Sequence, residues 1–302
     1  MKGFINFLKP PGMTSHGAVQ YFRKLLRIKK VGHTGTLDPG VAGVLPICLG
    51  KATRLAEYVT EMPKKYRTEI TLGVSTDSQD AYGMVTYTND CHHIDYNSFL
   101  HVLNKFKGTI QQTPPMVSAV RVNGKHLYEL ARKGIEINRK PRTIKIHDIS
   151  VFKVNWELPH PKILFDVTCS KGTYIRTLCA DIGDNLGVGA HMSYLIRTVS
   201  GPFFIEHSYT CEEITIAVEK QDFSFIHPMT TGIEYMPVIV VDENKRQLII
   251  HGNMISLPHN NYLDDGLYRI ETSNKELLAI GRKTSNKNGE INLVPIKVLT
   301  AE

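Results

Sequence analysis

The sequence predicts an α+β protein in which a large domain with a mixed sheet is followed by a small domain rich in strands. Its 302 residues exceed what one hydrophobic core usually serves, so two unequal domains are expected. Strand and helix patterns alternate through the first part, whereas short apolar runs among Gly-rich and Asn-rich turns follow Met236-Pro237. We therefore place a first domain at residues 1–235 and a second at residues 236–302.

The first sixty residues predict a strand, a helix, a loop and a buried strand. Residues 3–8 have a strand pattern, and Thr14 or Ser15 can cap the helix that follows. Between residues 31 and 50, a glycine-rich loop leads into a buried strand, and residues 51–59 have the length of a short helix. The apolar stripe of the first helix is Ala18, Phe22, Leu25 and Leu26.

The rest of the chain predicts further strands and two longer helices. Residues 65–72 alternate between two faces, as in a strand, and Tyr66 stands at the start. Residues 95–106 have helical spacing, and residues 117–122 run into the turn signal Asn123-Gly124. Strands follow at 144–154 and 163–169. The next helix starts at Lys171-Gly172-Thr173, holds Tyr174 and Arg176, and ends near Gly187 and Gly189. The last elements are a strand at 238–241, a helix at 242–250 and a polar turn at 284–289.

The positive charge of the protein is concentrated in the first part of the chain. Lys and Arg number 36 against 29 Asp and Glu, a net charge of +7. Residues 237–302 hold eight of each sign, so the whole excess lies before them, and residues 121–145 alone carry eight basic and two acidic side chains. This distribution favours a polyanionic partner, although a solvated surface explains the charge alone equally well.

Cysteine usage and hydropathy indicate a cytoplasmic protein without a membrane anchor. The five cysteines are widely spaced and form no C-x-x-C pair, so neither a disulfide framework nor a zinc site is indicated. The N-terminus lacks a signal pattern, and no apolar run approaches the roughly 18 residues of a membrane span.

The first candidate for chemistry is Asp38 in the loop GHTGTLDPG. Glycines on both sides permit close approach of a ligand to the backbone. An extra anion against a phosphate backbone is unfavourable, so Asp38 either caps a turn or is kept as a reactive group. The local sequence favours the cap, because Asp before Pro is a frequent turn former. A phosphate-binding loop is excluded, since Leu45 and Ala52 stand where its motif requires Gly and Ser or Thr.

Three further residues each have a chemical and a structural interpretation. Arg176 follows a strand-to-helix junction and could pair with a buried carboxylate, but alone it is more simply a surface arginine. Tyr66 lies among three cations in Lys64-Lys65-Tyr66-Arg67, which suits base stacking as well as a half-buried strand position. His33 could be a general base, a ligand or a wedge between bases, but no second histidine has metal spacing.

Taken together, these segments resemble the bacterial TruB-type tRNA pseudouridine synthases over essentially the whole chain. Each stretch alone is only suggestive, whereas their joint occurrence in this order is highly specific. The four matching stretches are Lys9-Pro10-Pro11-Gly12-Met13-Thr14-Ser15, Gly32-His33-Thr34-Gly35-Thr36-Leu37-Asp38-Pro39, Thr113-Pro114-Pro115-Met116-Val117-Ser118-Ala119 and Gly172-Thr173-Tyr174-Ile175-Arg176-Thr177-Leu178.

The resemblance implies a role for each matched residue. Asp38 is implied as the catalytic carboxylate, with Arg176 as its partner. His33 is implied to enter the T loop and fill the space of flipped nucleotides, and Tyr66 to stack on the target base. Tyr174 and Leu195 are implied as pocket residues. The resemblance also implies a pseudouridine synthase fold with a thumb insertion at about 117–146 and a PUA-like RNA-binding domain at 236–302.

The implied reaction is the isomerisation of uridine to pseudouridine at position 55 of tRNAs. The N-glycosidic bond breaks, the uracil turns in the pocket, and C5 joins the ribose, with no cofactor and no metal. The implied partner is the T loop and elbow of tRNA, bound by a monomer that needs no obligatory protein partner and no membrane.

Three other functions are compatible with parts of the sequence. A tRNA-binding folding chaperone, with or without catalysis, would use the same basic surface, but the presence of Asp38, Tyr66 and Arg176 argues against lost catalysis. A carboxylate-dependent glycosidase or nucleosidase would need a second acid, and no motif places one beside Asp38. A guide-RNA-dependent relative would be expected to have long basic tails, which the sequence lacks.

Overall fold

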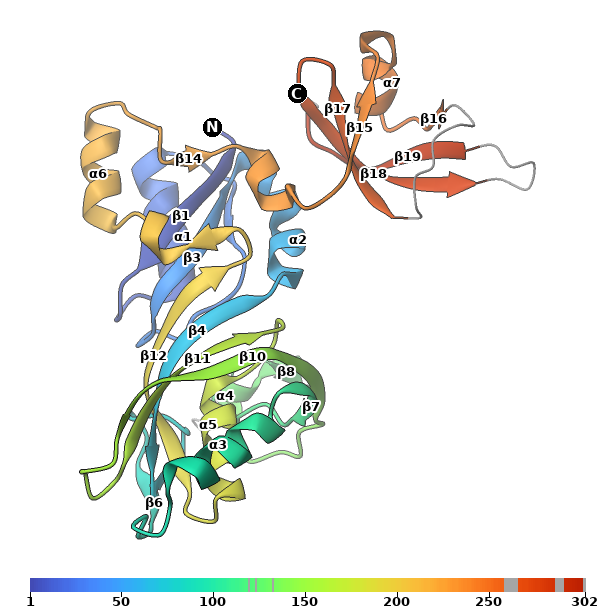
Figure 1. Cartoon of the computed structure of the whole chain (residues 1–302). Helices are drawn as coiled ribbons and strands as arrows, with labels where there is room; N and C mark the ends of the chain where they lie inside the picture. The colour runs from blue at the N-terminus through green and yellow to red at the C-terminus, as the bar shows by residue number, and fades with distance from the viewer. Residues whose placement is uncertain (119, 123, 132, 258–265, 286–290, 301–302) are drawn as a thin grey trace.

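The computed structural model describes residues 1–302 except 119, 123, 132, 258–265, 286–290 and 301–302. The described part contains an elongated mixed sheet flanked by helices and, at one end, a separate sheet formed by the C-terminal residues (Figure 1). Helices and strands mix in the larger part, and strands dominate the smaller one. The predicted α+β class is confirmed.

The main sheet is the framework of the larger part. Its spatial order is β14-β1-β3-β12-β4-β11-β10-β7, with β2 beside β3 and β13 beside β12. β12 pairs in parallel with β3 and antiparallel with β4, so it joins the strands on either side of it. The strands are β1 (Gly3–Lys9), β2 (Val31–His33), β3 (Ala42–Leu49), β4 (Lys64–Leu72), β7 (Gly108–Gln112), β10 (Arg142–Asn155), β11 (Lys162–Cys169), β12 (Ala190–Ser200), β13 (Phe203–Phe204) and β14 (Ile226–His227).

Helices and two short hairpins surround this sheet (Figure 1). The α-helices are α1 (Ser15–Leu26), α2 (Ala56–Glu61), α3 (Tyr96–Lys105), α4 (Leu127–Ala131), α5 (Ile175–Asn185) and α6 (Cys211–Glu219). The 3-10 helices are η1 (Gly50–Leu55), η2 (Ile205–His207) and η3 (Met229–Ile233). The hairpins are β5 (Val74–Thr76) with β6 (Val85–Thr88), and β8 (Arg121–Val122) with β9 (Lys125–His126).

Side-chain caps fix where the predicted helices begin. The Thr14 hydroxyl accepts a hydrogen bond from Gly17 N at 2.8 Å, which confirms the predicted cap of α1. Asp95 and Ser98 form a reciprocal capping box at α3. Two predictions for the larger part need correction. The helix predicted at residues 51–59 is a 3-10 turn followed by α2, and Tyr174 is the N-cap of α5 rather than part of it.

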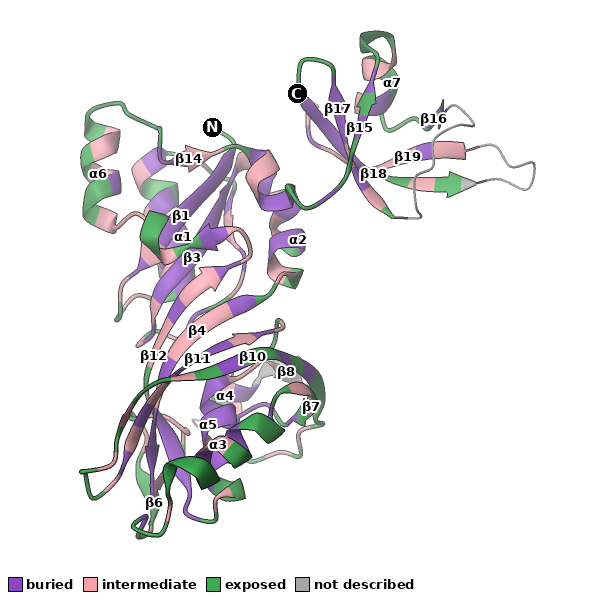
Figure 2. Ribbon diagram, viewed as in Figure 1, coloured by how far each residue is buried: buried purple, intermediate pink, exposed green. Residues whose placement is uncertain are grey.

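Apolar side chains form separate cores on either side of the junction at β12. One core packs α1 against β1 and β3, and another packs α3 and α5 against β4, β10 and β11. Tyr66 and Leu195 are partly buried and contact both cores. Strands β1 and β3 are buried along most of their length, whereas the outer turns of α3 and α6 are exposed (Figure 2). The two cores therefore meet around Tyr66 and Leu195.

The C-terminal residues form a second sheet with the order β15-β17-β18-β19-β16. Its elements are β15 (Val238–Val241), η4 (Glu243–Lys245), α7 (Arg246–Ile250), β16 (Ile255–Leu257), β17 (Leu267–Thr272), β18 (Leu277–Ser285) and β19 (Ile291–Val298). The predicted strand at 238–241 is confirmed, whereas the helix predicted at 242–250 is the 3-10 turn η4 followed by α7. The polar turn predicted at 284–289 lies largely outside the described residues.

Polar and apolar contacts attach the second sheet to η1 and α2. Arg54 Nη1 donates to the Val298 carbonyl at 2.6 Å, and Lys297 Nζ donates to the Arg54 carbonyl at 2.9 Å. Lys297 also forms an ion pair with Glu57 and lies 5.1 Å from the centre of the Tyr58 ring.

Among the described residues, no helix is both long enough and apolar enough to cross a membrane.

Candidate active site

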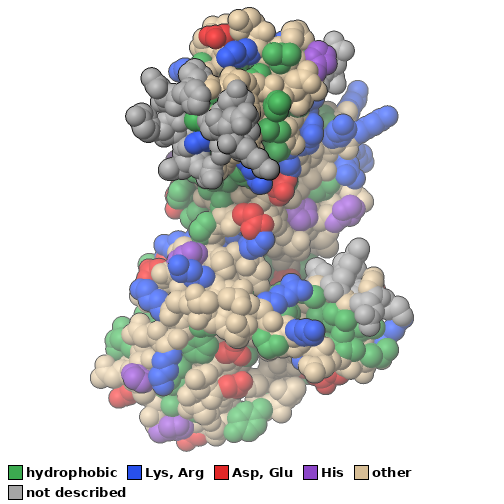
Figure 3. All heavy atoms as spheres, turned by 90° about the vertical axis from the view of Figure 1, so that its right-hand side faces the viewer, with side chains coloured by type: hydrophobic (Ala, Val, Ile, Leu, Met, Phe, Trp, Pro, Cys, Tyr) green, Lys and Arg blue, Asp and Glu red, His purple; other side chains and the backbone are tan. Residues whose placement is uncertain are grey.

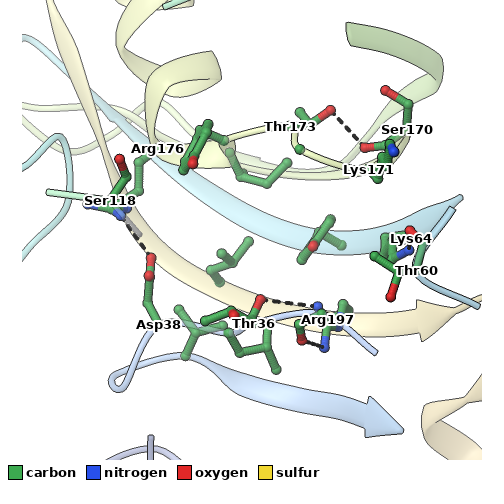
Figure 4. A pocket seen from close by; sticks show the side chains of 18 of the residues that line it. Thr36, Asp38, Thr60, Lys64, Ser118, Ser170, Lys171, Thr173, Arg176 and Arg197 are labelled. Atoms are coloured by element: carbon green, nitrogen blue, oxygen red, sulfur yellow. Dashed lines mark hydrogen bonds and ion pairs between the residues drawn. The ribbon is translucent and has the colours of Figure 1, made fainter. Parts of the chain in front are cut away.

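A cavity of about 370 Å³ lies where the loop after β2 faces β4, β12 and the start of α5. Asp38 and Arg176 point toward each other at one end of this cavity, and Lys64 and Thr60 lie at the other end (Figure 4). In the space-filling view, Lys and Arg side chains lie on both sides of a hollow in the middle of the face (Figure 3). Of the predicted site residues, Asp38, Tyr66, Tyr174, Arg176 and Leu195 line the cavity, and His33 does not.

Asp38 uses its backbone and its side chain for different purposes. Its carbonyl accepts a hydrogen bond from Val41 N at 3.0 Å, which closes a turn with Pro39 at the second position. Its carboxylate is 47% exposed and pairs with Arg176, Oδ2 to Nη2 at 3.0 Å. The turn therefore leaves the carboxylate available at the cavity.

Arg176 is buried, with only 5% of its side chain exposed. Its Nη1 donates to the Ser78 carbonyl at 3.1 Å, and its Nη2 donates to the Val117 carbonyl at 2.9 Å. The interpretation of Arg176 as a surface arginine is wrong. Because two carbonyls hold the guanidinium, its positive charge has a fixed position beside Asp38.

Asp80 is a second carboxylate at Arg176, and the sequence analysis missed it. Its Oδ2 lies 3.5 Å from Arg176 Nη1, and its Oδ1 accepts from the Ser78 hydroxyl at 2.6 Å and from Tyr82 N at 3.0 Å. Asp80 comes from the loop between β5 and β6, about a hundred residues from Arg176 in sequence. No local pattern could reveal this pairing, because tertiary packing alone brings the two residues together.

Two strands and the start of α5 supply the walls of the cavity. Tyr66 on β4 lies opposite Arg197 on β12, and Leu195 lies two residues before Arg197. Burial raises the pKa of the Tyr66 hydroxyl. The backbone of Tyr174 is held by the Gln112 amide, which accepts from Tyr174 N at 2.7 Å and donates to its carbonyl at 3.0 Å.

His33 lies at the end of β2, outside the group that lines the cavity. Its Nδ1 accepts a hydrogen bond from Gly35 N at 3.2 Å, which folds the ring back onto its own loop. Burial, followed by the positive charge of Arg197, lowers the pKa of the imidazole. His33 is thus favoured in its neutral form.

Three buried cations donate hydrogen bonds to backbone carbonyls around the cavity, and none was among the predicted site residues. Arg197 donates to the carbonyls of Val44 and Gly35 at 2.7 and 3.1 Å, and so ties β12 to the Asp38 loop. Lys9 Nζ donates to the carbonyls of Met13 and Pro39 at 2.7 and 3.2 Å. Lys64 Nζ donates to three carbonyls at the end of α2, namely those of Val59, Thr60 and Met62.

Burial makes these lysines easier to deprotonate than lysines in water. The pKa of Lys9 falls to about 8, mainly through loss of solvent and then through the nearby charge of Arg197. The pKa of Lys64 falls to about 8 for the same two reasons.

Within the described residues, no cluster of three or more His, Cys, Asp or Glu side chains has the arrangement of a metal site.

Comparison with known proteins identifies the family. The family model described as TruB family pseudouridylate synthase, N-terminal domain, matches residues 23–175. The model described as tRNA pseudouridylate synthase B C-terminal domain matches residues 176–234. The chain belongs to the TruB family. Residues 1–22 and 235–302 lie outside both matches.

Curated relatives of this TruB family member extend the similarity along the chain. The tRNA pseudouridine synthase B of Moorella thermoacetica is 43% identical over 301 residues, 98% of this chain and 99% of the relative. That of Symbiobacterium thermophilum is 49% identical over 250 residues, 83% of this chain and 82% of the relative. The reaction of this chain is the isomerisation of uridine to pseudouridine in tRNA.

Solved structures support the same fold. A chain in the crystal structure of a Cbf5–Nop10–Gar1 complex is 31% identical, with a TM-score of 0.75 over 99% of this chain and 85% of that chain. A chain in an H/ACA ribonucleoprotein bound to a substrate RNA that contains 2′-deoxyuridine is 29% identical, with a TM-score of 0.74 over the same shares. The described residues therefore have the pseudouridine synthase fold.

Proposed function

We propose that this TruB family member modifies the uridine at position 55 in the T loop of tRNAs, with Asp38 as the catalytic carboxylate. The observation that carries the proposal is the pair formed by the half-exposed Asp38 carboxylate and the buried Arg176 guanidinium at one end of the cavity. The ion pair with the anchored guanidinium fixes the direction in which the carboxylate points. Asp38 would thereby face the ribose and the edge of the target base.

The other residues receive roles that follow from where they lie. Tyr66 presents an aromatic ring to the cavity and would stack on the target base. Tyr174 and Leu195 would form the walls against which the base rests. The base must leave its stack, which costs a few kcal/mol. Stacking on Tyr66, phosphate contacts and insertion of His33 would offset that cost.

The proposal also covers the domain bounds, the cellular location, the oligomeric state and the need for cofactors. Residues 1–235 would form the catalytic domain, with a thumb at about 117–146, and residues 236–302 a PUA-like RNA-binding domain. The five strands between Val238 and Val298 support this division. We expect a cytoplasmic monomer that binds the tRNA elbow without an obligatory protein partner. We expect it to use neither a cofactor nor a metal. The C1′–N1 bond breaks and a C1′–C5 bond forms, while C5 loses a proton and N1 gains one, so the reaction is an isomerisation without a redox change.

The test uses unmodified tRNA transcripts incubated with the wild type, Asp38→Asn and Asp166→Asn. Asp166 is the matched control, because it also pairs with an arginine, Arg67 at 2.7 Å, but lies outside the cavity. Pseudouridine is mapped by chemical adduct and reverse transcription. The wild type and Asp166→Asn should modify one T-loop uridine, and Asp38→Asn should lose at least about a thousandfold in rate.

Two results would contradict separate parts of the proposal. Activity of Asp38→Asn near the wild-type level would remove Asp38 from the chemistry. Modification by the wild type at a uridine outside the T loop, or unchanged modification of a transcript with cytidine at position 55, would contradict the proposed position. Retained tRNA binding by Asp38→Asn would show that the loss is chemical.

A further inference from the structure

The charged donors of the cavity are largely occupied by protein acceptors. Arg176 donates to two carbonyls and pairs with two carboxylates. Arg197 and Lys64 each donate to three carbonyls. A neutral nucleobase that enters this cavity therefore needs other partners for its polar edge.

Ser118 offers such a partner. It lines the same cavity, only 6% of the residue is exposed, and its hydroxyl has no hydrogen-bond partner among the described residues. Figure 4 shows Ser118 beside Arg176 and facing the Asp38 loop. A buried hydroxyl without a partner is unfavourable, so its presence at a cavity requires an explanation.

The backbone around Ser118 is fixed although its side chain is free. Ser118 N donates to the Met116 carbonyl at 3.0 Å, and the Ser118 carbonyl accepts from Tyr128 N at 3.1 Å. The preceding carbonyl, that of Val117, accepts from Arg176 Nη2 at 2.9 Å. The same guanidinium thus positions both Asp38 and the segment that carries Ser118.

We propose that the Ser118 hydroxyl forms a hydrogen bond with a carbonyl oxygen of the target uracil. A hydroxyl can rotate, and it can both donate and accept. It can therefore release one carbonyl while the base turns and bond to the other carbonyl afterwards, without any proton transfer. Cations that are already bonded to backbone carbonyls could not adapt in this way. This inference rests on the proposed entry of the target uridine into the cavity beside Asp38.

The first test compares Ser118→Ala with Ser200→Ala. Ser200 is also buried, its hydroxyl also lacks a partner within the described chain, and it lies on β12 outside the cavity lining. Single-turnover rates are measured with saturating enzyme, and tRNA dissociation constants by filter binding. Ser118→Ala should lower the rate about five- to tenfold with a dissociation constant within about twofold, as loss of one neutral hydrogen bond predicts. Ser200→Ala should match the wild type.

The second test identifies the atom that Ser118 contacts. Transcripts carry 2-thiouridine or 4-thiouridine at the target position, because sulfur accepts hydrogen bonds poorly. If Ser118 bonds a carbonyl, the penalty of Ser118→Ala should shrink to less than about twofold with one of the two thio substrates. A full penalty with both thio substrates, a wild-type rate for Ser118→Ala, or an equal loss in Ser200→Ala would overturn the inference. None of these results would restore activity to Asp38→Asn, so the two proposals fail separately.

Discussion

Arg176 Nη2 lies 3.0 Å from Asp38 Oδ2, and the two side chains differ greatly in exposure, 5% against 47%. The arginine is anchored by the carbonyls of Ser78 and Val117, so it is the fixed member of the pair. The carboxylate reaches the cavity from a short turn. The position of Asp38 is therefore set as much by α5 as by its own loop.

Replacing Arg176 with lysine should lower the single-turnover rate by about a hundredfold or more. An ammonium can keep a positive charge near Asp38, but it cannot also reach Asp80 and both carbonyls from one planar group. Arg67→Lys is the matched control, since Arg67 on β4 forms a similar fork with Asp166 on β11, at 2.7 and 3.0 Å, outside the cavity lining. Equal rates for the two variants would refute a special role for the guanidinium.

Asp80→Asn should reduce the rate by about tenfold and leave tRNA binding nearly unchanged. The amide keeps the size of the side chain but loses the charge that faces Arg176 Nη1 at 3.5 Å. Asp77→Asn provides the control, because Asp77 lies in the same loop and accepts only from Met84 N at 2.9 Å in the described contacts. A similar loss in both variants would point to general loosening of the loop.

Tyr66→Leu should lose more activity than Tyr66→Phe. Stacking of a base on an aromatic ring contributes about 1–3 kcal/mol, which phenylalanine retains and leucine does not. The expected gap between the two single-turnover rates is about five- to a hundredfold. Tyr194→Leu, on the neighbouring strand and outside the cavity lining, should behave as the wild type. Similar rates for leucine and phenylalanine at position 66 would rule out stacking.

The buried Lys9 should make stability depend on pH. Its pKa falls from 10.5 to about 8 on folding, so between these values the unfolded chain binds more protons than the folded chain. The contribution of Lys9 to stability is therefore present above about pH 10.5 and is lost as the pH falls through 8. At neutral pH the folded chain bears the cost of burying the charge.

The measurement is urea unfolding of the wild type and Lys9→Met at about pH 7.5 and about pH 9.5. The difference in unfolding free energy, wild type minus variant, should rise by about 1–2 kcal/mol across this interval. Other groups that titrate there cancel in the difference. Lys24→Met, at an exposed position of α1, should give a constant difference. A constant difference for Lys9→Met would contradict the lowered pKa.

The sequence predicted most elements because their signals are local. The cap at Thr14, the alternation in β4 and the helical spacing of α3 each depend on residues within a few positions. For Asp38, the local sequence predicts the turn but not the partner of the carboxylate. The Asp-Pro turn exists and uses the backbone carbonyl, whereas the pairing of the carboxylate depends on a helix that begins at Ile175.

The cavity residues that the sequence did not predict were missed for a common physical reason. Arg197, Lys9 and Lys64 are charged and buried, and cations of this kind are almost always exposed. The acceptors of Arg197 lie far away in sequence, in the Asp38 loop and β3. Those of Lys64 lie two to five residues before it, but only the fold shows that both cations are enclosed. Ser118 was missed as well, although it stands inside a quoted motif, because the absence of a partner can be seen only in three dimensions.

The place of β12 in the main sheet has a consequence for how the enzyme is made. β12 lies between β3 and β4, yet it is synthesised more than a hundred residues after both. While the chain emerges from the ribosome, β12 is not yet present to join β3, which follows the Asp38 loop, to β4, which carries Tyr66. The nascent protein would remain without its pocket until residues 190–200 appear, and would depend on a late long-range pairing step that slows folding.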